Sequence, residues 1–343
     1  MFIYLVAALA ALVLVGASCN VISGALGTGM LPAFPGGDWF FLVKNYIGDL
    51  ILWLAALAIL GIIFAVLGER SLRGRLRHTY PRRRPLHDPR VCVVLTAYND
   101  EESIGPATLD FRSQSHVETA IVVDNNCSDQ TAARARAAGA RVVHEHNQGY
   151  GYACIRGLRA ALETTDAGVI VLTEGDGTFS GHDIDKMLPF LEDADFVVGN
   201  RVTPGLVDSR SQMDSFFVWG NQLGAKLLQL RFWDWRFLGK VRLGDLGCTM
   251  RALRREALEQ IIDDLTVGGN HFSPHMIMTA IRHGQTVVEV PITFWPRVGV
   301  SKGASRNLVR GTAIGLAMLW HIMTYRPNGH RQRTKTNASE KVA

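Results

Sequence analysis

Residues 91–101 read Val-Cys-Val-Val-Leu-Thr-Ala-Tyr-Asn-Asp-Glu, an apolar run that ends in a cluster of polar side chains. An uninterrupted run of this length is typical of a strand that helices cover on both faces. Similar short runs occur at 120–123, 141–144, 169–172, 197–198 and 287–292. Helix-like stretches alternate with them, at 129–138, 151–164, 184–191, 213–230, 254–262 and 274–283. The alternation predicts an α/β domain built on a mostly parallel sheet.

Polar turns follow three of these strands at the point where each strand ends. They read Tyr98-Asn99-Asp100-Glu101, Asp124-Asn125-Asn126 and Glu174-Gly175-Asp176. Parallel sheets bind their ligands beyond the carboxyl ends of the strands. We therefore expect these turns to form one ligand site.

The turn Glu174-Gly175-Asp176 carries two carboxylates that are two residues apart. Such a pair suits a hard divalent cation, Mg²⁺ or Mn²⁺, which prefers oxygen ligands and keeps positions for phosphate oxygens. Acidic turns with glycine also follow strands where no metal binds, so the triplet alone leaves both interpretations open.

Two glycine-containing segments have the composition of phosphate-binding elements. Asn147-Gln148-Gly149-Tyr150-Gly151 opens a helix, so that Asn147, Gly149 and the helix N–H groups could face an anionic donor. Residues 297–303 place Arg297, Ser301 and Lys302 in one loop, the composition of a phosphate clamp. An ordinary strand-to-helix turn and a solvated basic loop are the alternatives.

Taken in order, these segments resemble glycosyltransferase family 2, and more narrowly the polyprenyl-phosphate (dolichyl-phosphate-type) sugar synthases. The resemblance covers about residues 90–305. Its segments are Thr96–Glu101, Asp124–Thr131, Glu174–Asp176, Gly199–Arg201, Asp245–Arg251, and Glu289–Ile292 followed by Arg297–Lys302. The sequence departs from the family pattern at Thr96, where the family has proline, and at Asn125 and Glu174, where it has aspartate. No Gln-x-x-Arg-Trp occurs, which argues against a processive polysaccharide synthase.

The resemblance implies a Rossmann-like domain of the glycosyltransferase A type at residues 91–305 and inverting transfer of a hexose from a UDP- or GDP-sugar to a polyprenyl phosphate. Glu174 and Asp176 would then bind the metal, and Arg297, Ser301 and Lys302 the diphosphate. Arg201 would face the acceptor phosphate, and Asp245 would orient the sugar or act as base toward a hydroxyl acceptor. The nucleotide would be held by Thr96, Tyr98, Asp100 and Asp124.

The N-terminal part of the 343-residue chain predicts a membrane anchor. No charged side chain occurs from Met1 to Gly37, and a second uncharged run extends from Leu50 to Gly68. Each run contains about 20 apolar residues, the length of a transmembrane helix. We expect a two-helix hairpin, with helices at 1–25 and 49–68 and a short extracytoplasmic loop at 26–48. A cleaved signal peptide followed by one anchor is the alternative.

A basic linker at 69–90 follows the second apolar run. It holds eight arginines against Glu69 and Asp88, so its balance is 8 − 2 = +6, and the rest of the +5 chain is near neutral at 5 − 6 = −1. This concentration of charge favours a cytoplasmic catalytic domain at the plasma membrane, lying against anionic headgroups, over a nucleic-acid-binding surface. A stop-transfer signal without a further role explains the arginines equally well.

The remaining segments complete the predicted organisation. Residues 306–326 predict an amphipathic helix in the plane of the membrane interface, and 327–343 a disordered basic tail. The aromatic cluster at 232–237 would touch lipid or belong to the core. Five cysteines without metal-site spacing favour a reducing compartment.

Two other functions stay open at this point. The acceptor could be a hydroxyl of a cell-envelope glycan or glycolipid, or the chain could be an inactive membrane scaffold. The sequence does not identify the sugar, and it leaves open whether the chain forms a homo-oligomer.

Overall fold

The computed structural model describes residue 59 and residues 85–211, 213–233, 241–299 and 308–325. The predicted transmembrane helices, the loop between them, the basic linker up to residue 84 and the tail fall outside this part, apart from Ile59. None of the helices in the described ranges is long and apolar enough to cross a bilayer. The transmembrane hairpin therefore stays a prediction.

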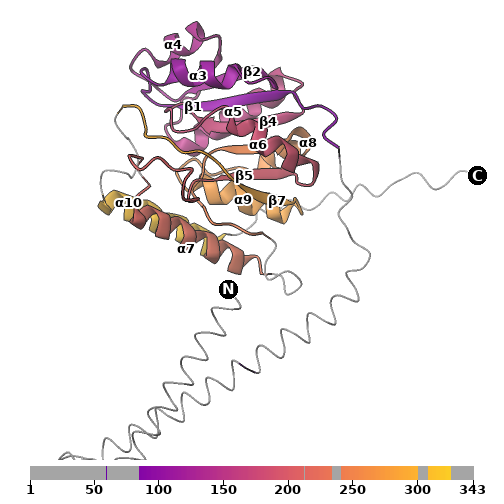
Figure 1. The fold of residues 1–343 in the computed structure, drawn as a ribbon, viewed down its shortest axis with the longest axis vertical. Helices are drawn as coiled ribbons and strands as arrows, with labels where there is room; N and C mark the ends of the chain where they lie inside the picture. The colour runs from indigo at the N-terminus through magenta and orange to yellow at the C-terminus, as the bar shows by residue number, and fades with distance from the viewer. Residues whose placement is uncertain (1–58, 60–84, 212, 234–240, 300–307, 326–343) are drawn as a thin grey trace, which may run out of the picture. The chain divides into compact units, whose positions relative to one another are not determined.

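Seven strands form one sheet in the order β3-β2-β1-β4-β6-β5-β7 (Figure 1). The strands are β1 (Val91–Ala97), β2 (Val117–Asp124), β3 (Arg141–His144), β4 (Val169–Glu174), β5 (Phe196–Asn200), β6 (Arg251–Arg254) and β7 (Val287–Pro291). Only β6 runs antiparallel to its neighbours, β4 and β5. The prediction of a mostly parallel sheet is confirmed.

Strand β6 was not predicted, because arginines stand at both of its ends. Both side chains are buried and donate to backbone carbonyls: Arg251 Nη2 to Cys248 O at 3.0 Å, and Arg254 Nε to Leu191 O at 2.7 Å. A buried polar group is tolerated when it is hydrogen-bonded in this way. The arginines therefore make the sequence of β6 resemble that of an exposed segment, although the strand lies inside the sheet.

The helices and 3₁₀ turns cover both faces of the sheet. They are α3 (Ile104–Arg112), α4 (Thr131–Ala137), α5 (Tyr150–Thr164), α6 (Asp183–Met187), η1 (Leu188–Glu192), α7 (Ser215–Arg231), α8 (Arg255–Ile261), η2 (Ile262–Asp264), α9 (Phe272–Arg282) and α10 (Leu308–Thr324). Right-handed crossovers put α3 and α4 on one face and α5 on the other. Accordingly α3 contacts α4, while α5 packs on β1 and β2 and meets α9.

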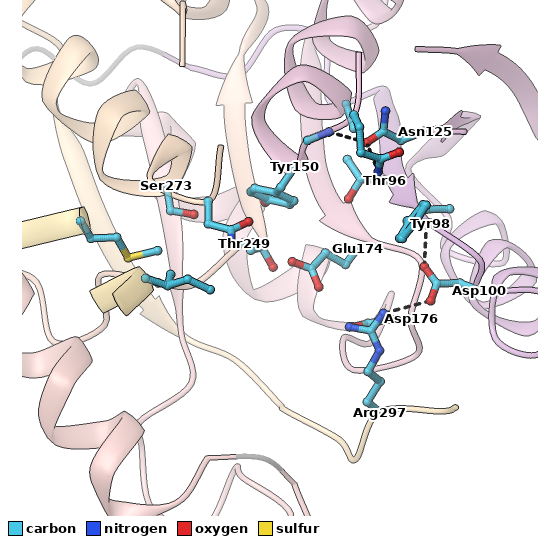
Figure 2. A pocket seen from close by; sticks show the side chains of 18 of the residues that line it. Thr96, Tyr98, Asp100, Asn125, Tyr150, Glu174, Asp176, Thr249, Ser273 and Arg297 are labelled. Carbon is cyan, nitrogen blue, oxygen red and sulfur yellow. Dashed lines mark hydrogen bonds and ion pairs between the residues drawn. The ribbon is translucent and has the colours of Figure 1, made fainter. Parts of the chain in front are cut away.

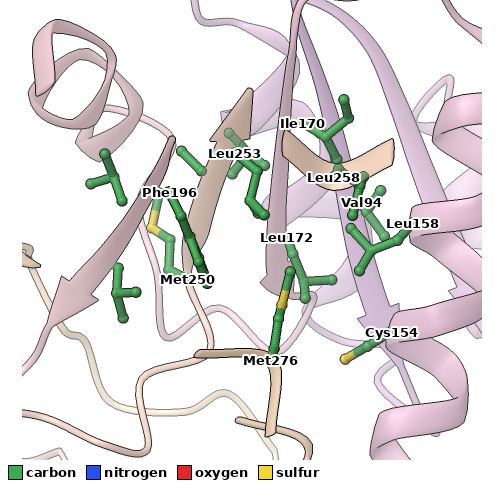
Figure 3. Close-up of a cluster of buried hydrophobic side chains, with 14 of the residues drawn as sticks. Val94, Cys154, Leu158, Ile170, Leu172, Phe196, Met250, Leu253, Leu258 and Met276 are labelled. Carbon is green, nitrogen blue, oxygen red and sulfur yellow. The ribbon is translucent and has the colours of Figure 1, made fainter. Parts of the chain in front are cut away.

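The core runs through the sheet from α5 to β5. Val94 of β1 and Leu158 of α5 meet near Ile170 of β4, and Phe196 and Leu253 continue the apolar layer toward β7 (Figure 3). Every residue of β1 is buried. The central strands are thus fixed along their whole length, up to the turns that follow them.

The chain changes direction between β1 and β4. It leaves β1 toward β2 and β3, and it returns through α5 to β4 on the other side of β1. Thr96, the penultimate residue of β1, and Glu174, the last residue of β4, are register partners. Such a switch point opens a crevice at the carboxyl ends of the strands, which is where α/β proteins bind ligands.

Helix α10 forms within the predicted range 306–326, and it packs against α7 and α9. Its polar residue His321 faces the protein, because His321 Nε2 lies 3.2 Å from His275 Nδ1 of α9. Tyr325, just past the helix, is buried, whereas Leu316, Trp320 and Met323 are each more than half exposed. The outward face of α10 is therefore apolar.

The contact between α9 and α10 depends on neutral histidines. Burial, followed by the neighbouring His275 and His271, lowers the pKa of His321 to about 4. Burial also lowers the pKa of His275, whose Nε2 lies 3.1 Å from Asp264 O. Since the folded protein resists protonation at these sites, the unfolded chain binds more protons as the pH falls below about 6.5.

We expect this contact to lose stability as the pH falls from about 6.5 toward 4. In detergent, the melting temperature of the wild type should drop more between pH 7 and pH 5.5 than that of H321Q, by about 2–4 °C. H182Q removes an exposed histidine and should follow the wild type. Equal slopes for wild type and H321Q would contradict the role of His321.

A second prediction concerns the packing of α5 on the sheet. A Cβ atom at Gly157 would lie 2.3 Å from Val94 Cγ1 and 2.7 Å from Val123 Cγ2. G157A should lower the free energy of unfolding by about 1–3 kcal/mol, measured by urea denaturation. G105A, in α3, meets nothing within 4 Å and should leave it unchanged or raise it by up to about 1 kcal/mol. If both variants behave alike, α5 does not approach β1 so closely.

Candidate active site

A cavity of about 570 Å³ lies at the carboxyl ends of β1 and β4 (Figure 2). It is lined by Thr96, Ala97, Tyr98, Asp100, Asn125, Gln148, Gly149, Tyr150, Ala153, Glu174, Asp176, Arg201, Gly247, Thr249, Asn270, Ser273, Arg297, Ile314 and Met318. Eight of the predicted site residues are among them: Thr96, Tyr98, Asp100, Gly149, Glu174, Asp176, Arg201 and Arg297. The turns that the sequence singled out do converge.

Three predicted residues lie beside the cavity without lining it, namely Asp124, Asn147 and Asp245. Asp124 Oδ1 accepts from Cys127 N at 2.8 Å, and its Oδ2 lies 3.2 Å from His144 Nδ1, so this carboxylate ties β2 to β3. The carbonyl of Asn147 accepts from Asn125. The predicted clamp residues Ser301 and Lys302 are outside the described residues.

Asn125 lines the cavity but was not predicted as a site residue. Its Nδ2 donates to Asn147 O at 2.7 Å, and its Oδ1 accepts from Gly149 N at 3.0 Å. Because an aspartate could not donate to the Asn147 carbonyl, this geometry explains asparagine where the family has a second aspartate. The departure from the family pattern was the signal, and it was available in the sequence.

The glycines at the start of α5 serve a purpose different from the one expected. Gly268 O accepts from Gly151 N at 2.9 Å and from Tyr152 N at 3.3 Å, so these helix N–H groups are occupied. A Cβ at Gly151 would lie 2.0 Å from Val267 O, and one at Gly149 2.4 Å from Gly268 O. The N–H groups of Gly151 and Tyr152 are therefore not directed at a donor. The glycines admit the loop before α9.

The two predicted metal ligands lie together at the end of β4. Asp176 Oδ1 accepts from Thr178 Oγ1 at 2.6 Å and from Thr178 N at 3.0 Å. The Glu174 side chain points into the cavity (Figure 2). Burial, and next the charge of Asp176, raise the pKa of Glu174 to about 8. Two carboxylates that repel one another in this way favour a bound cation.

The residues present fit a divalent ion in part. The described residues hold no group of three or more acidic, histidine or cysteine ligands, so Glu174 and Asp176 would be the protein's share. Mg²⁺ and Mn²⁺ sites commonly combine one or two carboxylates with water and substrate phosphate oxygens. The acid pair therefore suits an ion that arrives with a diphosphate.

Arg297 supplies the positive charge beside these acids. Its Nη1 lies 3.0 Å from Asp176 Oδ2, and its Nη2 lies 2.9 Å from Asp100 Oδ1. Burial acts to lower the pKa of Arg297, but the charges of Asp176 and Asp100 outweigh it, and the pKa is raised. The arginine thus stays charged and links the turn after β1 to the turn after β4.

Arg201 is held by Asp245. Its Nε and Nη2 lie 2.8 and 2.9 Å from the two oxygens of Asp245, a fully buried carboxylate. Asp245 Oδ1 also accepts from Gly247 N, while Glu289 Oε1 accepts from the backbone N of Asp245 at 2.8 Å. Asp245 thus acts on the cavity through Arg201, and Glu289, quoted only as part of a motif, fixes the loop that carries Asp245.

Residues 92–262 match the family described as Glycosyl transferase family 2. The chain is also 30% identical over 230 residues to the dolichyl-phosphate hexose transferase of Haloferax volcanii, covering 67% of this chain and 92% of that protein. The protein belongs to glycosyltransferase family 2. A further relative is the undecaprenyl-phosphate mannosyltransferase of Micrococcus luteus, 31% identical over 249 residues, covering 67% and 96% of the two chains.

Solved structures support the fold. Glucosyl-3-phosphoglycerate synthase from Mycobacterium tuberculosis, crystallised with Mn²⁺, UDP-glucose and phosphoglyceric acid, superposes with a TM-score of 0.50 at 20% sequence identity. The match covers 70% of this chain and 81% of that one. The predicted glycosyltransferase A-type, Rossmann-like domain is therefore confirmed.

The Arg201–Asp245 pair leads to a stability prediction. D245N leaves a buried guanidinium without its counter-charge and should lower the free energy of unfolding by about 3–5 kcal/mol, measured by urea denaturation without ligands. D208N removes the partner of the exposed Arg210 and should have little effect. A D245N protein as stable as the wild type would contradict the assigned role of Asp245.

Proposed function

We propose that the protein transfers a hexose, with inversion, from a UDP- or GDP-sugar to a polyprenyl phosphate at the cytoplasmic face of the plasma membrane. The observation that carries this proposal is the composition of the cavity. All three acidic residues lining its described part lie at the carboxyl ends of β1 and β4: Glu174 ends β4, and Asp100 and Asp176 stand in the turns that follow the two strands. The lining also holds Arg201 and the apolar side chains Ile314 and Met318 of α10, which we assign to the acceptor end.

The donor would occupy the acidic end. Thr96, Tyr98 and Asn125 lie together where β1 and β2 end, which suits a nucleoside (Figure 2). Asp124, Asn147 and Gly149 would support this part from the adjoining loops. The diphosphate would extend toward Glu174 and Asp176, with Arg297 and the predicted Ser301 and Lys302 of the same loop closing on it.

A divalent ion, Mg²⁺ or Mn²⁺, would neutralise the charge that develops on the leaving diphosphate. Glu174 and Asp176 would hold it, since their mutual repulsion and burial are relieved by a cation. Arg297 would then exchange its contact with Asp176 for a diphosphate oxygen, to which its planar guanidinium can donate two hydrogen bonds.

The acceptor would occupy the other end. A phosphate monoester is already anionic at neutral pH, so its oxygen needs positioning and charge neutralisation rather than a general base. Arg201 can supply the charge, and Asp245 is already engaged in holding it. The names of two relatives, a dolichyl-phosphate and an undecaprenyl-phosphate sugar transferase, support this acceptor class.

A membrane location fits the exposed face of α7 and α10. These neighbouring helices expose Phe216, Trp219, Leu223 and Leu230 on α7 and Leu316, Trp320 and Met323 on α10, with Trp219 at 74% and Trp320 at 67% exposure. Apolar and tryptophan side chains on one face suit the interface of a bilayer. The predicted hairpin and arginine-rich linker would hold this face at anionic headgroups.

The test incubates membranes containing the protein with labelled UDP- and GDP-sugars, with and without polyprenyl phosphate and Mn²⁺ or Mg²⁺. We expect a chloroform-soluble labelled product that requires both the lipid phosphate and the metal. D176N should reduce its formation by about 100-fold or more, since it removes a stabilising charge from the reaction centre. D208N should not.

Two outcomes would overturn the proposal. Label appearing in a glycan or glycolipid through a hydroxyl, with none on polyprenyl phosphate, would assign the alternative acceptor. Absence of transfer and of metal-dependent nucleotide-sugar binding would indicate an inactive scaffold.

A further inference from the structure

The end of the cavity nearest α10 has its own chemistry. We assign to it Arg201, Gly247, Thr249, Asn270 and Ser273 of the cavity lining, together with Ile314 and Met318 of α10. In the view of Figure 2, Thr249 and Ser273 lie on the opposite side of Glu174 from Tyr98 and Asp100. The lining of one cavity thus combines small polar side chains with apolar ones from α10.

Thr249 has an unused hydrogen-bonding group at this place. It is 8% exposed, and its hydroxyl has no hydrogen-bond partner in the described part of the chain. Buried hydroxyls are normally paired. The Thr249 hydroxyl is itself buried within the wall, so it reaches a ligand in the cavity when the side chain rotates. Because the hydroxyl makes no bond, rotating the side chain to present it to the cavity loses none.

Helix α9 begins at the same wall. The helix has eleven residues, its N-cap His271 makes no side-chain cap, and its third residue is Pro274, which has no N–H. Phe272 N donates to Gly269 O. This leaves the N–H and hydroxyl of Ser273 as donors at a helix end that carries a partial positive charge.

The start of α9 is held in place by α5. Gly268 O, just before the helix, accepts from the N–H groups of Gly151 and Tyr152. The glycines of α5 permit this approach, as described above. The position of Ser273 relative to β4 is therefore set by the fold rather than by a free loop.

Arg201 completes the set. The pair with Asp245 uses Nε and Nη2, so Nη1 lies outside that bidentate contact. A guanidinium donor, two hydroxyls and a helix N-terminus together make an anion site. The adjacent Ile314 and Met318 suit an apolar chain attached to that anion.

We propose that Thr249, Ser273 and the N-terminus of α9 bind, with Arg201, the phosphate of the lipid acceptor, whose prenyl chain leaves along Ile314 and Met318. This rests on the proposed function. A phosphate oxygen forms the bond to the anomeric carbon of the donor sugar. The bond from that carbon to the donor diphosphate breaks, and its electron pair leaves with the nucleoside diphosphate. No proton is transferred.

The test is a steady-state comparison of T249V and S273A with the wild type, using undecaprenyl phosphate in detergent. T249V should raise the acceptor KM by roughly tenfold, and S273A severalfold, with the donor KM nearly unchanged. T108V is the matched control, because Thr108 of α3 also has a buried hydroxyl without a partner in the described residues and lies outside the cavity. A rise in the donor KM instead would place these hydroxyls on the donor sugar and overturn the proposal.

A binding measurement separates this inference from the proposed function. Calorimetry with geranylgeranyl phosphate and no donor should show binding to the wild type and T108V, weakened about tenfold in T249V. If no sugar transfer to polyprenyl phosphate is found but this loss appears, the proposed reaction fails and the phosphate site stands. If transfer proceeds and T249V binds like the wild type, the phosphate site is refuted.

Discussion

The pairing of β1 with β4 is the constraint on which the site depends. The chain leaves β1 toward β2 and β3 and returns to β4 on the other side of β1, so a crevice opens at the carboxyl ends where Thr96 and Glu174 meet as register partners. Both strands are buried almost throughout, and this packing fixes the positions at which the turns that follow them begin. Groups that must act within a fraction of an ångström are best carried by such elements.

The two arginines at the cavity differ in how firmly their carboxylate partners hold them. Asp245 is buried beneath Arg201 and also accepts hydrogen bonds from the backbone N–H groups of Arg201 and Gly247. Its carboxylate therefore holds the Arg201 side chain in one position. Arg297 instead bridges Asp100 and Asp176, acids from two separate turns, and comes from a segment next to residues outside the described part. Burial and the neighbouring charge of Asp176 both raise the pKa of Glu174, so its charged form is stabilised when a cation binds. The fixed pair suits positioning of a ligand, whereas the bridged pair suits exchange of partners when one arrives.

Sequence patterns predicted those elements in which buried positions carry apolar side chains. The apolar strands and α5 were found for this reason, while β6 was missed because its buried arginines satisfy carbonyls, and α3 because Gly105 and Pro106 stand in its first turn. Motif spacing identified the carboxylates and arginines that converge. It could not show that Asn125 holds the neighbouring loop, or that Gly268 caps α5, because both depend on contacts between distant segments. Thr249 lies within the family-like segment Asp245–Arg251 but was given no role there, and no motif contained Ser273.

The distribution of acids explains how one cavity could bring two anions together. A donor diphosphate and an acceptor phosphate repel one another, and in a site with little water this repulsion is weakly screened. Carboxylates at the donor end are useful only where a cation joins them, and carboxylates at the acceptor end would add repulsion. In the described lining the acids are Asp100, Glu174 and Asp176, in the part assigned to the donor, while Arg201, Thr249 and Ser273 belong to the part assigned to the acceptor. A hydroxyl acceptor would reverse the requirement, because it needs a base at the end where no carboxylate lines the described wall. The distribution of charge therefore favours a phosphate acceptor over a hydroxyl acceptor.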